Sequence, residues 1–257
     1  MEIQDQLGRN LKIETAPKRI ISLVPSQTEL LVDLGLEESI IGITHFCVHP
    51  FHLRDTKTTL GGTKKVIFRK VRELEPDIIL CNKEENTKEM VEELEKIAPV
   101  HISDVANLSD VYDLMQQYGK IFNCSELAET MVNSIKKKID HLAEMAEGSE
   151  KRKVAYFIWN NPLMVVGRGT FINEMLELNN FENVFEEKRY PETNAEELIE
   201  KDIDICMLSS EPFPFEEKHI PEFNKYSSEV LIVDGEYFSW YGSRLLKALD
   251  YFKQFHL

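Results

Sequence analysis

The chain has 257 residues, of which 42% are hydrophobic and 29% are charged, as is typical of proteins with packed cores. Its 45 acidic residues outnumber its 30 basic residues, which gives a formal net charge of -15. Proteins that bind nucleic acid or an anionic membrane surface carry basic faces, so we expect neither partner. No run approaches the roughly 20 apolar residues of a membrane-spanning helix. The four cysteines form no close pair, so no disulfide framework is expected.

Three segments of the first half recur, in the same order, in the second half. The apolar run at residues 19–26 corresponds to the run at residues 153–160, and each leads into a polar loop. Two later pairs follow, namely residues 75–81 with 201–208 and residues 99–103 with 229–234. Apolar runs separated by helical segments predict βαβ units and a parallel sheet. We therefore expect an α/β fold with two similar lobes and a ligand-binding cleft between them.

The first predicted lobe covers residues 1–122 and opens with a short extension that packs on it. Ser26 and Glu29 have the spacing of a capping box, which predicts a helix that ends at Gly35. A charged helix is expected over residues 87–96. The predicted strands of this lobe lie at residues 40–43, 77–81 and 100–103, in addition to the first apolar run.

A linking helix is predicted within residues 123–148. Apolar residues recur at helical spacing, and Gly148 supplies a stop signal. They are Leu127, Met131, Ile135, Ile139 and Leu142. Such a helix would be roughly 35 Å long, so we expect one backbone helix that bridges the two lobes.

The second predicted lobe covers residues 149–257. Its first strand is expected at residues 154–159, followed by a small hairpin around residues 165–167. Thr170 is the expected N-cap of a helix over residues 171–178. Residues 183–185 are the expected second strand.

Several of these motifs together resemble a known family. The stretch Pro17–Leu30, with the sequence PKRIISLVPSQTEL, and residues 34–43 resemble the start of the helical-backbone (class III) substrate-binding proteins of ABC importers. Gly61-Gly62 and residues 71–80 resemble the glycine turn and the following strand of that class. This class delivers cobalamin, ferric siderophores or haem, and the resemblance covers nearly the whole chain. The similarity is closest to the cobalamin-binding member.

The resemblance implies two lobes, each a parallel sheet flanked by helices, that are bridged by one long backbone helix. It also implies a small ligand in the interlobe cleft, docking of both lobes onto an ABC permease, and no intrinsic cofactor. The ligand would carry the metal, as cobalamin, a ferric siderophore or haem. We expect a monomer. The family is periplasmic, but the polar residues Met1–Gln6 show no signal peptide or lipobox, so the chain as written would be cytoplasmic.

The candidate binding residues lie in loops that follow predicted strands, because ligands of open parallel sheets bind beyond the carboxyl ends of the strands. Trp159, Trp240 and Tyr241 are expected to form aromatic walls, and packing of one tryptophan into the lobe interface is the alternative. Three cations, Lys83, Arg168 and Arg244, are expected to hold polar groups of the ligand. Two carboxylates occupy equivalent loops, Glu84 and Glu211.

Histidine and cysteine gather in one loop of the first lobe. His45, Cys47 and His49 are residue types that ligate zinc, cobalt or iron, but their spacing matches no closed metal motif. Direct metal ligation, contact of His45 and His49 with a metal-bearing ligand, and ordinary loop packing are therefore all open alternatives.

Acidic residues further out in each lobe are candidates for docking to the permease. They are Glu89 in the first lobe and Glu216 and Glu217 in the second. Such residues would set orientation and encounter rate rather than affinity. Ordinary solvated faces are the alternative interpretation.

No nucleophile elbow, phosphate-binding glycine loop or zinc-protease motif is visible, so we expect no enzymatic activity. Two other functions remain open. One is a cytoplasmic metal- or corrinoid-handling protein, or an enzyme, on the same scaffold. The other is a scaffold that has lost its transport role and binds no small ligand.

Overall fold

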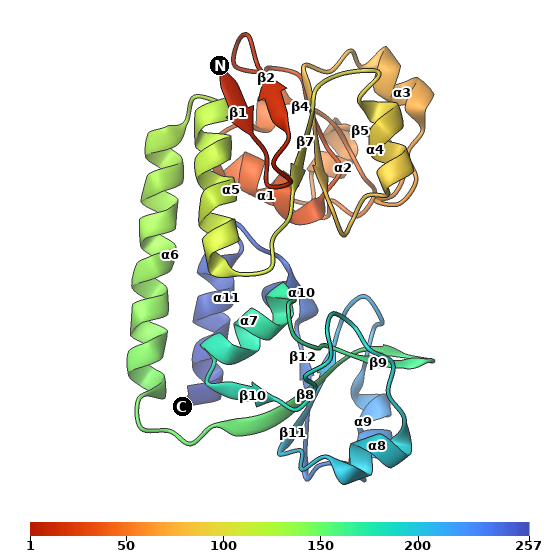
Figure 1. Cartoon of the computed structure of the whole chain (residues 1–257), viewed down its shortest axis with the longest axis vertical. Helices are drawn as coiled ribbons and strands as arrows, with labels where there is room; N and C mark the ends of the chain where they lie inside the picture. Colours follow the sequence, from red (N-terminus) through yellow and green to blue (C-terminus); the bar gives the residue numbers. More distant parts are fainter. Residues whose placement is uncertain (257) are drawn as a thin grey trace. The chain divides into compact units, whose positions relative to one another are not determined.

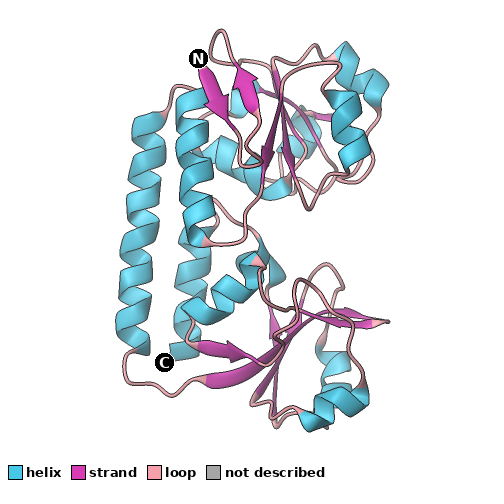
Figure 2. Ribbon diagram, viewed as in Figure 1, coloured by secondary structure: helices cyan, strands magenta, loops and turns pink. Residues whose placement is uncertain are grey.

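The structure is a computed structural model that describes residues 1–256. It divides into two compact units. Unit 1 contains residues 1–105, 109–134 and 241–244, and unit 2 contains residues 106–108, 135–240 and the chain from Leu245 onward. Both units combine helices with strands (Figure 2), which confirms the predicted α/β fold.

Unit 1 is built on a parallel five-stranded sheet (Figure 1). In spatial order its strands are β5 (Thr58–Thr59), β4 (Ile40–Ile43), β3 (Ile20–Ser22), β6 (Ile78–Asn82) and β7 (Val100–Ser103). Every residue of β3, β6 and β7 is buried, as in parallel sheets that are covered on both faces. The strands predicted at residues 40–43, 77–81 and 100–103 are confirmed.

Helices cover both faces of this sheet. Apolar residues of α3 (Phe68–Glu73) and α4 (Lys88–Leu94) share one core cluster with alternate strand residues such as Ile21 and Ile79. The other face meets α1 (Pro25–Asp33) through the hydroxyls of Ser22 and Thr28. It also meets α5 (Leu108–Ile121) through the rings of His101 and Tyr118. A short helix, α2 (Leu53–Thr56), and a 3-10 turn at Glu37–Ser39 complete the unit.

Helix α1 begins differently from the prediction. Its N-cap is Val24, no side chain caps it, and Pro25 occupies the first turn. The predicted capping box is therefore wrong. Ser26 already lies inside the helix, and the Glu29 carboxylate bonds Arg244 instead of the backbone.

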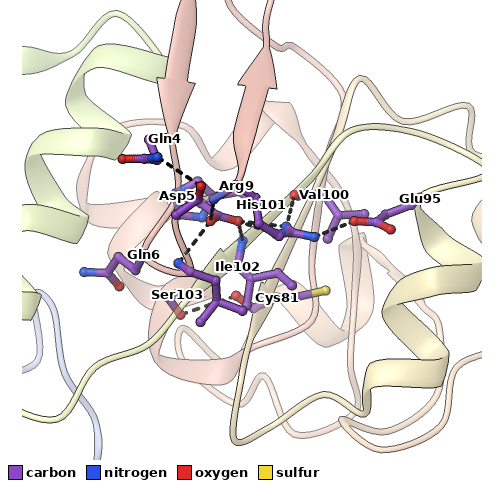
Figure 3. A network of polar contacts seen from close by, with 12 residues as sticks. Gln4, Asp5, Gln6, Arg9, Cys81, Glu95, Val100, His101, Ile102 and Ser103 are labelled. Atoms are coloured by element: carbon purple, nitrogen blue, oxygen red, sulfur yellow. Dashed lines mark hydrogen bonds and ion pairs between the residues drawn. The ribbon is translucent and has the colours of Figure 1, made fainter.

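The N-terminal extension forms a hairpin that is fixed to β7 (Figure 3). Strands β1 (Glu2–Gln4) and β2 (Asn10–Lys12) pair antiparallel. Between them, buried Asp5 accepts hydrogen bonds from the Arg9 side chain and from the backbone N–H of Ile102. Arg9 in turn donates to the Val100 carbonyl oxygen. The expectation that this extension packs on the first lobe is thus confirmed.

A four-residue segment from near the C-terminus completes unit 1. We call Tyr241–Arg244 the strap. Arg244 forms a bidentate ion pair with Glu29, with Nε–Oε2 at 2.6 Å and Nη2–Oε1 at 3.1 Å. Both side chains are only 5% exposed. Gly242 has a φ of +91° and lies against Leu30, so a side chain there would be strained.

Unit 2 repeats the sheet of unit 1. Its parallel strands, in spatial order, are β10 (Phe181–Asn183), β8 (Arg152–Asn160), β11 (Ile205–Ser209) and β12 (Glu229–Val233). This order matches β4-β3-β6-β7, which confirms the three repeats found in the sequence. Strand β9 (Leu163–Val165) pairs antiparallel with β8, so a small hairpin is present, but it turns at residues 161–162 and not at the predicted residues 165–167.

The helices of unit 2 again lie on two faces. One face carries α8 (Ala195–Glu200) and α9 (Ile220–Phe223), whose Leu198 and Phe223 join the core cluster of Phe157. The other face carries the rings of Tyr156 and Phe238, 5.1 Å apart. It includes α7 (Phe171–Leu178), α10 (Gly235–Ser239) and α11 (Leu245–Phe252), followed by a 3-10 turn at Lys253–His256. A second 3-10 turn, Glu217–His219, leads into α9 on the first face.

Two details of unit 2 test the sequence reasoning. Thr170 is the N-cap of α7 and accepts a hydrogen bond from the backbone N–H of Asn173, as predicted. The strand expected at residues 183–185 is instead Phe181–Asn183. It stops there because the Asn183 side chain accepts the backbone N–H of Phe185 and turns the chain.

In each unit, an aspartate directly before an inner strand of the sheet forms the same set of hydrogen bonds. Asp77, just before β6, accepts the backbone N–H groups of Lys18 and Arg19 through Oδ2. Asp204, just before β11, accepts the backbone N–H of Lys153 through Oδ2 at 2.7 Å. In both cases the aspartate N–H donates back to the carbonyl of the same neighbouring residue. The repeat therefore extends to individual hydrogen bonds.

The predicted linking helix is α6 (Ser125–Ala146), and it carries residues of both units. Its apolar face differs in one respect from the prediction, because Leu127 is 44% exposed. Ala128 and Val132 are buried instead, together with Met131 and Ile135. Among residues 1–256, no helix is sufficiently long and apolar to cross a membrane.

Replacing Arg244 should destabilise the protein strongly. In Arg244→Met the Glu29 carboxylate stays buried without its cation, so we expect the free energy of unfolding to fall by about 3–5 kcal/mol. Urea denaturation measures this change. The matched control is Arg168→Met, which removes an exposed ion pair with Glu186 and should cost under about 1 kcal/mol. Equal losses in the two variants would contradict this assignment.

His101 should make unit 1 sensitive to mild acid. Burial lowers its pKa, although hydrogen bonding to Gln117 and the charge of Asp5 oppose the shift. Its Nδ1 has no partner, and Nε2 lies 2.7 Å from Gln117 Oε1. Because the folded pKa is below the unfolded value of about 6.5, the unfolded state gains the proton first, and stability falls as pH drops below that value.

The measurement is the free energy of unfolding between pH 7.5 and 5. In His101→Gln the decrease over this range should be smaller than in the unchanged chain, whatever the stability at pH 7.5. Carboxylate titration is common to both proteins and cancels in the comparison. Parallel pH profiles would show that His101 does not contribute.

Candidate functional site

The loops at the carboxyl ends of the parallel strands are the candidate site in each unit. In unit 1 they are residues 44–52 after β4, the glycine turn at residues 61–67, and residues 83–86 after β6. In unit 2 they are residues 161–162 and the segment after β11. Of the residues nominated by the sequence, these loops contain His45, Cys47, His49, Lys83, Glu84 and Glu211, and Trp159 lies near the carboxyl end of β8.

The loop after β4 exposes aromatic side chains. Phe46 is 50% exposed and Phe51 is 68% exposed, and the Arg54 guanidinium lies 6.0 Å from the centre of the Phe51 ring. His45 is also exposed, with its ring centre 4.1 Å from that of Phe46. The sequence reasoning missed both phenylalanines. Their place after a predicted strand was the available signal.

Gly62 sets how closely this loop approaches the glycine turn. A Cβ atom at Gly62 would lie 3.1 Å from His45 Cε1 and 3.3 Å from Phe46 Cε2. Both contacts are tighter than ordinary van der Waals distances. The backbone N–H of His45 also donates to the Gly61 carbonyl oxygen. The paired glycines therefore form the surface on which His45 and Phe46 rest.

The structure does not bring His45, Cys47 and His49 together as a metal site. Within residues 1–256, no group of three or more His, Cys, Asp or Glu side chains is arranged to hold a metal ion. Cys47 is buried, with its Sγ 3.1 Å from Thr28 Oγ1 and 3.3 Å from Thr44 Oγ1. Burial raises the pKa of the Cys47 thiol, which makes it a poor ligand. The alternative in which these three residues bind a metal ion directly is therefore wrong. His45 is exposed and His49 is half-buried.

The loop after β6 is organised by one buried asparagine. Asn82 Oδ1 accepts the backbone N–H groups of Glu84 and Glu85 at 2.8 and 3.1 Å. Lys83 is half-exposed and forms an ion pair with Asp104, and the Glu84 carbonyl oxygen accepts a hydrogen bond from Lys64. Burial raises the pKa of Glu85. Lys83 and Glu84 are therefore placed at the candidate loop, but each already has an intramolecular contact.

In unit 2, Trp159 is the exposed aromatic residue. It is 38% exposed, its Nε1 donates to the Asn161 carbonyl oxygen, and its ring meets Phe213 edge-on at 5.8 Å. The Phe213 ring in turn lies 5.5 Å from that of His219. An exposed indole supported by a second ring is a suitable surface for a flat ligand.

Trp240 occupies a different environment. It is only 8% exposed, and its Nε1 donates to Glu211 Oε1 at 3.1 Å, which also accepts a hydrogen bond from Ser239. Burial raises the pKa of Glu211, although these two hydrogen bonds oppose the shift. The expectation of an open Trp240 wall is corrected, because the ring is packed and hydrogen-bonded.

Tyr241 and Arg244 are likewise internal. Tyr241 is 8% exposed and its hydroxyl accepts hydrogen bonds from Gln27 and Asn82. Arg244 is held by Glu29. Tyr241 therefore does not form an open aromatic wall, and Arg244 is not available to bind a polar group of a ligand. Both expectations from the sequence are wrong. Arg168 is more accessible, with an exposed ion pair to Glu186 at 2.8 Å.

The predicted docking residues are all on the surface. Glu89 is exposed in the first turn of α4. Glu216 caps the turn Glu217–His219 and pairs with Lys218, which lowers its pKa. Glu217 is exposed in the same turn.

Comparisons with known proteins agree with this architecture. An uncharacterized ABC transporter substrate-binding lipoprotein of Bacillus subtilis is 28% identical over 184 residues, which are 68% of this chain and 58% of that protein. The match thus spans less than two thirds of that relative. The vitamin B12-binding protein of Pectobacterium carotovorum is 23% identical over 237 residues, which are 90% of this chain and 86% of that protein.

Solved structures share the fold. The vitamin B12-binding protein of Vibrio cholerae has a TM-score of 0.82 at 16% identity, covering 94% of this chain and 97% of that one. A haem-binding protein of Roseiflexus has a TM-score of 0.82 at 15% identity, covering 93% and 98%. These relatives are named as binding proteins, not enzymes, in agreement with the expected lack of enzymatic activity. Residues 20–237 match the family described as periplasmic binding protein, and the chain belongs to that family.

Proposed function

We propose that this chain captures a cobalamin-like or iron-chelate ligand and hands it to an ABC permease. The supporting observation is the exposure of Phe46 and Phe51 on a loop after β4 and of Trp159 near the carboxyl end of β8. Exposed apolar area is unfavourable by about 25 cal/mol per Å², so a flat, bulky ligand that covers it gains affinity. The names of the relatives, which include vitamin B12- and haem-binding proteins, favour the same class.

Polar side chains on the candidate loops, together with Arg168 between β9 and α7, would orient the ligand. In unit 1 these are His45, His49, Lys83 and Glu84, and in unit 2 they are Arg168 and Glu211. A histidine can contact the metal of a metal-bearing ligand without forming a closed protein site. The interlobe cleft stays a prediction.

The names of the relatives also support transport over the cytoplasmic metal-handling or enzyme alternative. They include a substrate-binding lipoprotein and vitamin B12-binding proteins. We propose a periplasmic or membrane-anchored location and a monomeric state, both of which follow the family resemblance. Binding and hand-off require no covalent chemistry by the chain.

Removing the exposed aromatic side chains should weaken ligand binding. An aromatic contact contributes on the order of 1 kcal/mol, so Trp159→Ala should lower affinity about fivefold, and Phe46→Ala combined with Phe51→Ala should lower it about thirtyfold. Isothermal titration with cyanocobalamin, haemin and ferrichrome identifies the ligand and measures the loss.

The matched control is Ile199→Ala, which truncates an apolar residue of α8 that is about as exposed as Phe51. Its affinity should equal that of the unchanged chain. Absence of saturable binding to all three compounds would contradict the proposed ligand class. Equal weakening by the control would show that the aromatic loops are not the binding surface.

We further propose that Glu89 and Glu217 contact basic residues of the permease. Glu217 is the better candidate of the second pair, because Glu216 already caps its own turn. Exposed charges of this kind act mainly on the rate of encounter and on its salt dependence.

Charge reversal at these positions should impair docking but spare ligand binding. In Glu89→Lys with Glu217→Lys we expect about a tenfold slower association with the reconstituted permease at low salt, converging with the unchanged chain at high salt. Surface plasmon resonance on permease nanodiscs measures both. Glu200→Lys, on α8, is the control and should associate normally. Unchanged association in the double variant would exclude the two glutamates.

A further inference from the structure

A buried polar network connects the strap to the loops of unit 1. The Tyr241 hydroxyl accepts hydrogen bonds from Gln27 Nε2 and Asn82 Nδ2, each at 3.0 Å. Gln27 and Asn82 also donate to Ser103 Oγ, and Gln27 Oε1 accepts the hydroxyl of Tyr118. Gln27, Asn82 and Ser103 are all less than 5% exposed. The position of Tyr241 is therefore fixed by groups that water does not reach.

Asn82 carries this connection into the loop after β6. Its Nδ2 meets Tyr241, while its Oδ1 holds the backbone N–H groups of Glu84 and Glu85. One side chain therefore bonds the strap on one side and the loop on the other. Rotation of the Asn82 amide would break both sets of bonds together.

The connection continues to the exposed aromatic loop. Asn86, at the end of the β6 loop, accepts the backbone N–H of Asn82 and donates to the Thr63 carbonyl oxygen at 2.8 Å. Thr63 follows Gly62, against which His45 and Phe46 pack. Three candidate loops of unit 1 thus form one continuous set of contacts that starts at Tyr241.

We propose that Tyr241 is a positioning residue that holds the three candidate loops of unit 1 in their binding geometry through Asn82. The effect on ligand binding rests on the proposed function, because it assumes that Phe46 and its neighbours contact a ligand. It gives Tyr241 an indirect role in place of the direct ligand contact expected from the sequence. The ring is packed, and the hydroxyl accepts a hydrogen bond from Asn82.

The variant Tyr241→Phe tests the role of the hydroxyl, because it keeps the packed ring. Hydrogen–deuterium exchange of the full chain should be about fivefold faster at the N–H groups of Glu84 and Glu85, since a single hydrogen bond contributes about 1 kcal/mol. The segment at residues 61–66 should also exchange faster. Peptides from β3 and from unit 2 should be unchanged, which separates a local effect from general unfolding.

The matched control is Tyr156→Phe, which removes a buried hydroxyl that donates to Ser209 in unit 2. It should leave exchange at residues 83–86 unchanged. In an Asn82→Ala background, Tyr241→Phe should add no further increase at residues 61–66. Unchanged exchange at Glu84 and Glu85 in Tyr241→Phe, or an equal increase in the control, would overturn the proposal.

Ligand binding is then measured separately, with cyanocobalamin and haemin as probes. If the unchanged chain binds one of them, Tyr241→Phe should bind it severalfold more weakly and Tyr156→Phe should bind it normally. Equal affinity of Tyr241→Phe and the unchanged chain would overturn the positioning role. If the unchanged chain binds neither probe, the proposed function fails, while the exchange result still decides whether Tyr241 orders the loops.

Discussion

Unit 1 depends on satisfying buried polar groups that its own contiguous sequence leaves without partners. Glu29 is inside a helix that packs on the sheet, and a buried carboxylate without a cation is costly. Arg244 supplies that cation with two hydrogen bonds, and Tyr241 supplies the acceptor for Gln27 and Asn82. The strap is short, but the geometry of the carboxyl-end loops follows from where it is held.

The fold was largely predictable because its determinants are local. The buried strands appear as apolar runs, and the Thr170 cap needs only residues that lie within one helical turn. The paired halves could be recognised because the same pattern occurs twice. Elements without such a signal were missed, among them α5 and the β1–β2 hairpin, whose position depends on contacts of Asp5 with a strand far along the chain.

The candidate site was less predictable, since it depends on distant pairings. The loops were correctly placed after strands, and Trp159 proved to be exposed. The sequence could not reveal that Arg244 meets Glu29, 215 positions earlier, and so is not available to a ligand. The place of Phe46 and Phe51 after a predicted strand was a signal for the loop, but the extent of their exposure is decided by the packing of the whole unit.

The strap has a consequence for how the chain is made. Synthesis runs from the N-terminus, so the sheet of unit 1 is complete in sequence long before Tyr241 and Arg244 have been added. Until Tyr241 and Arg244 leave the ribosome, the Glu29 carboxylate lacks its cation and Asn82 lacks its hydroxyl partner. A fragment that ends at the repeat boundary would therefore leave Glu29 and Asn82 without these two partners. The sheet unit of the first half thus depends on four residues that follow the last strand of the second half in the chain.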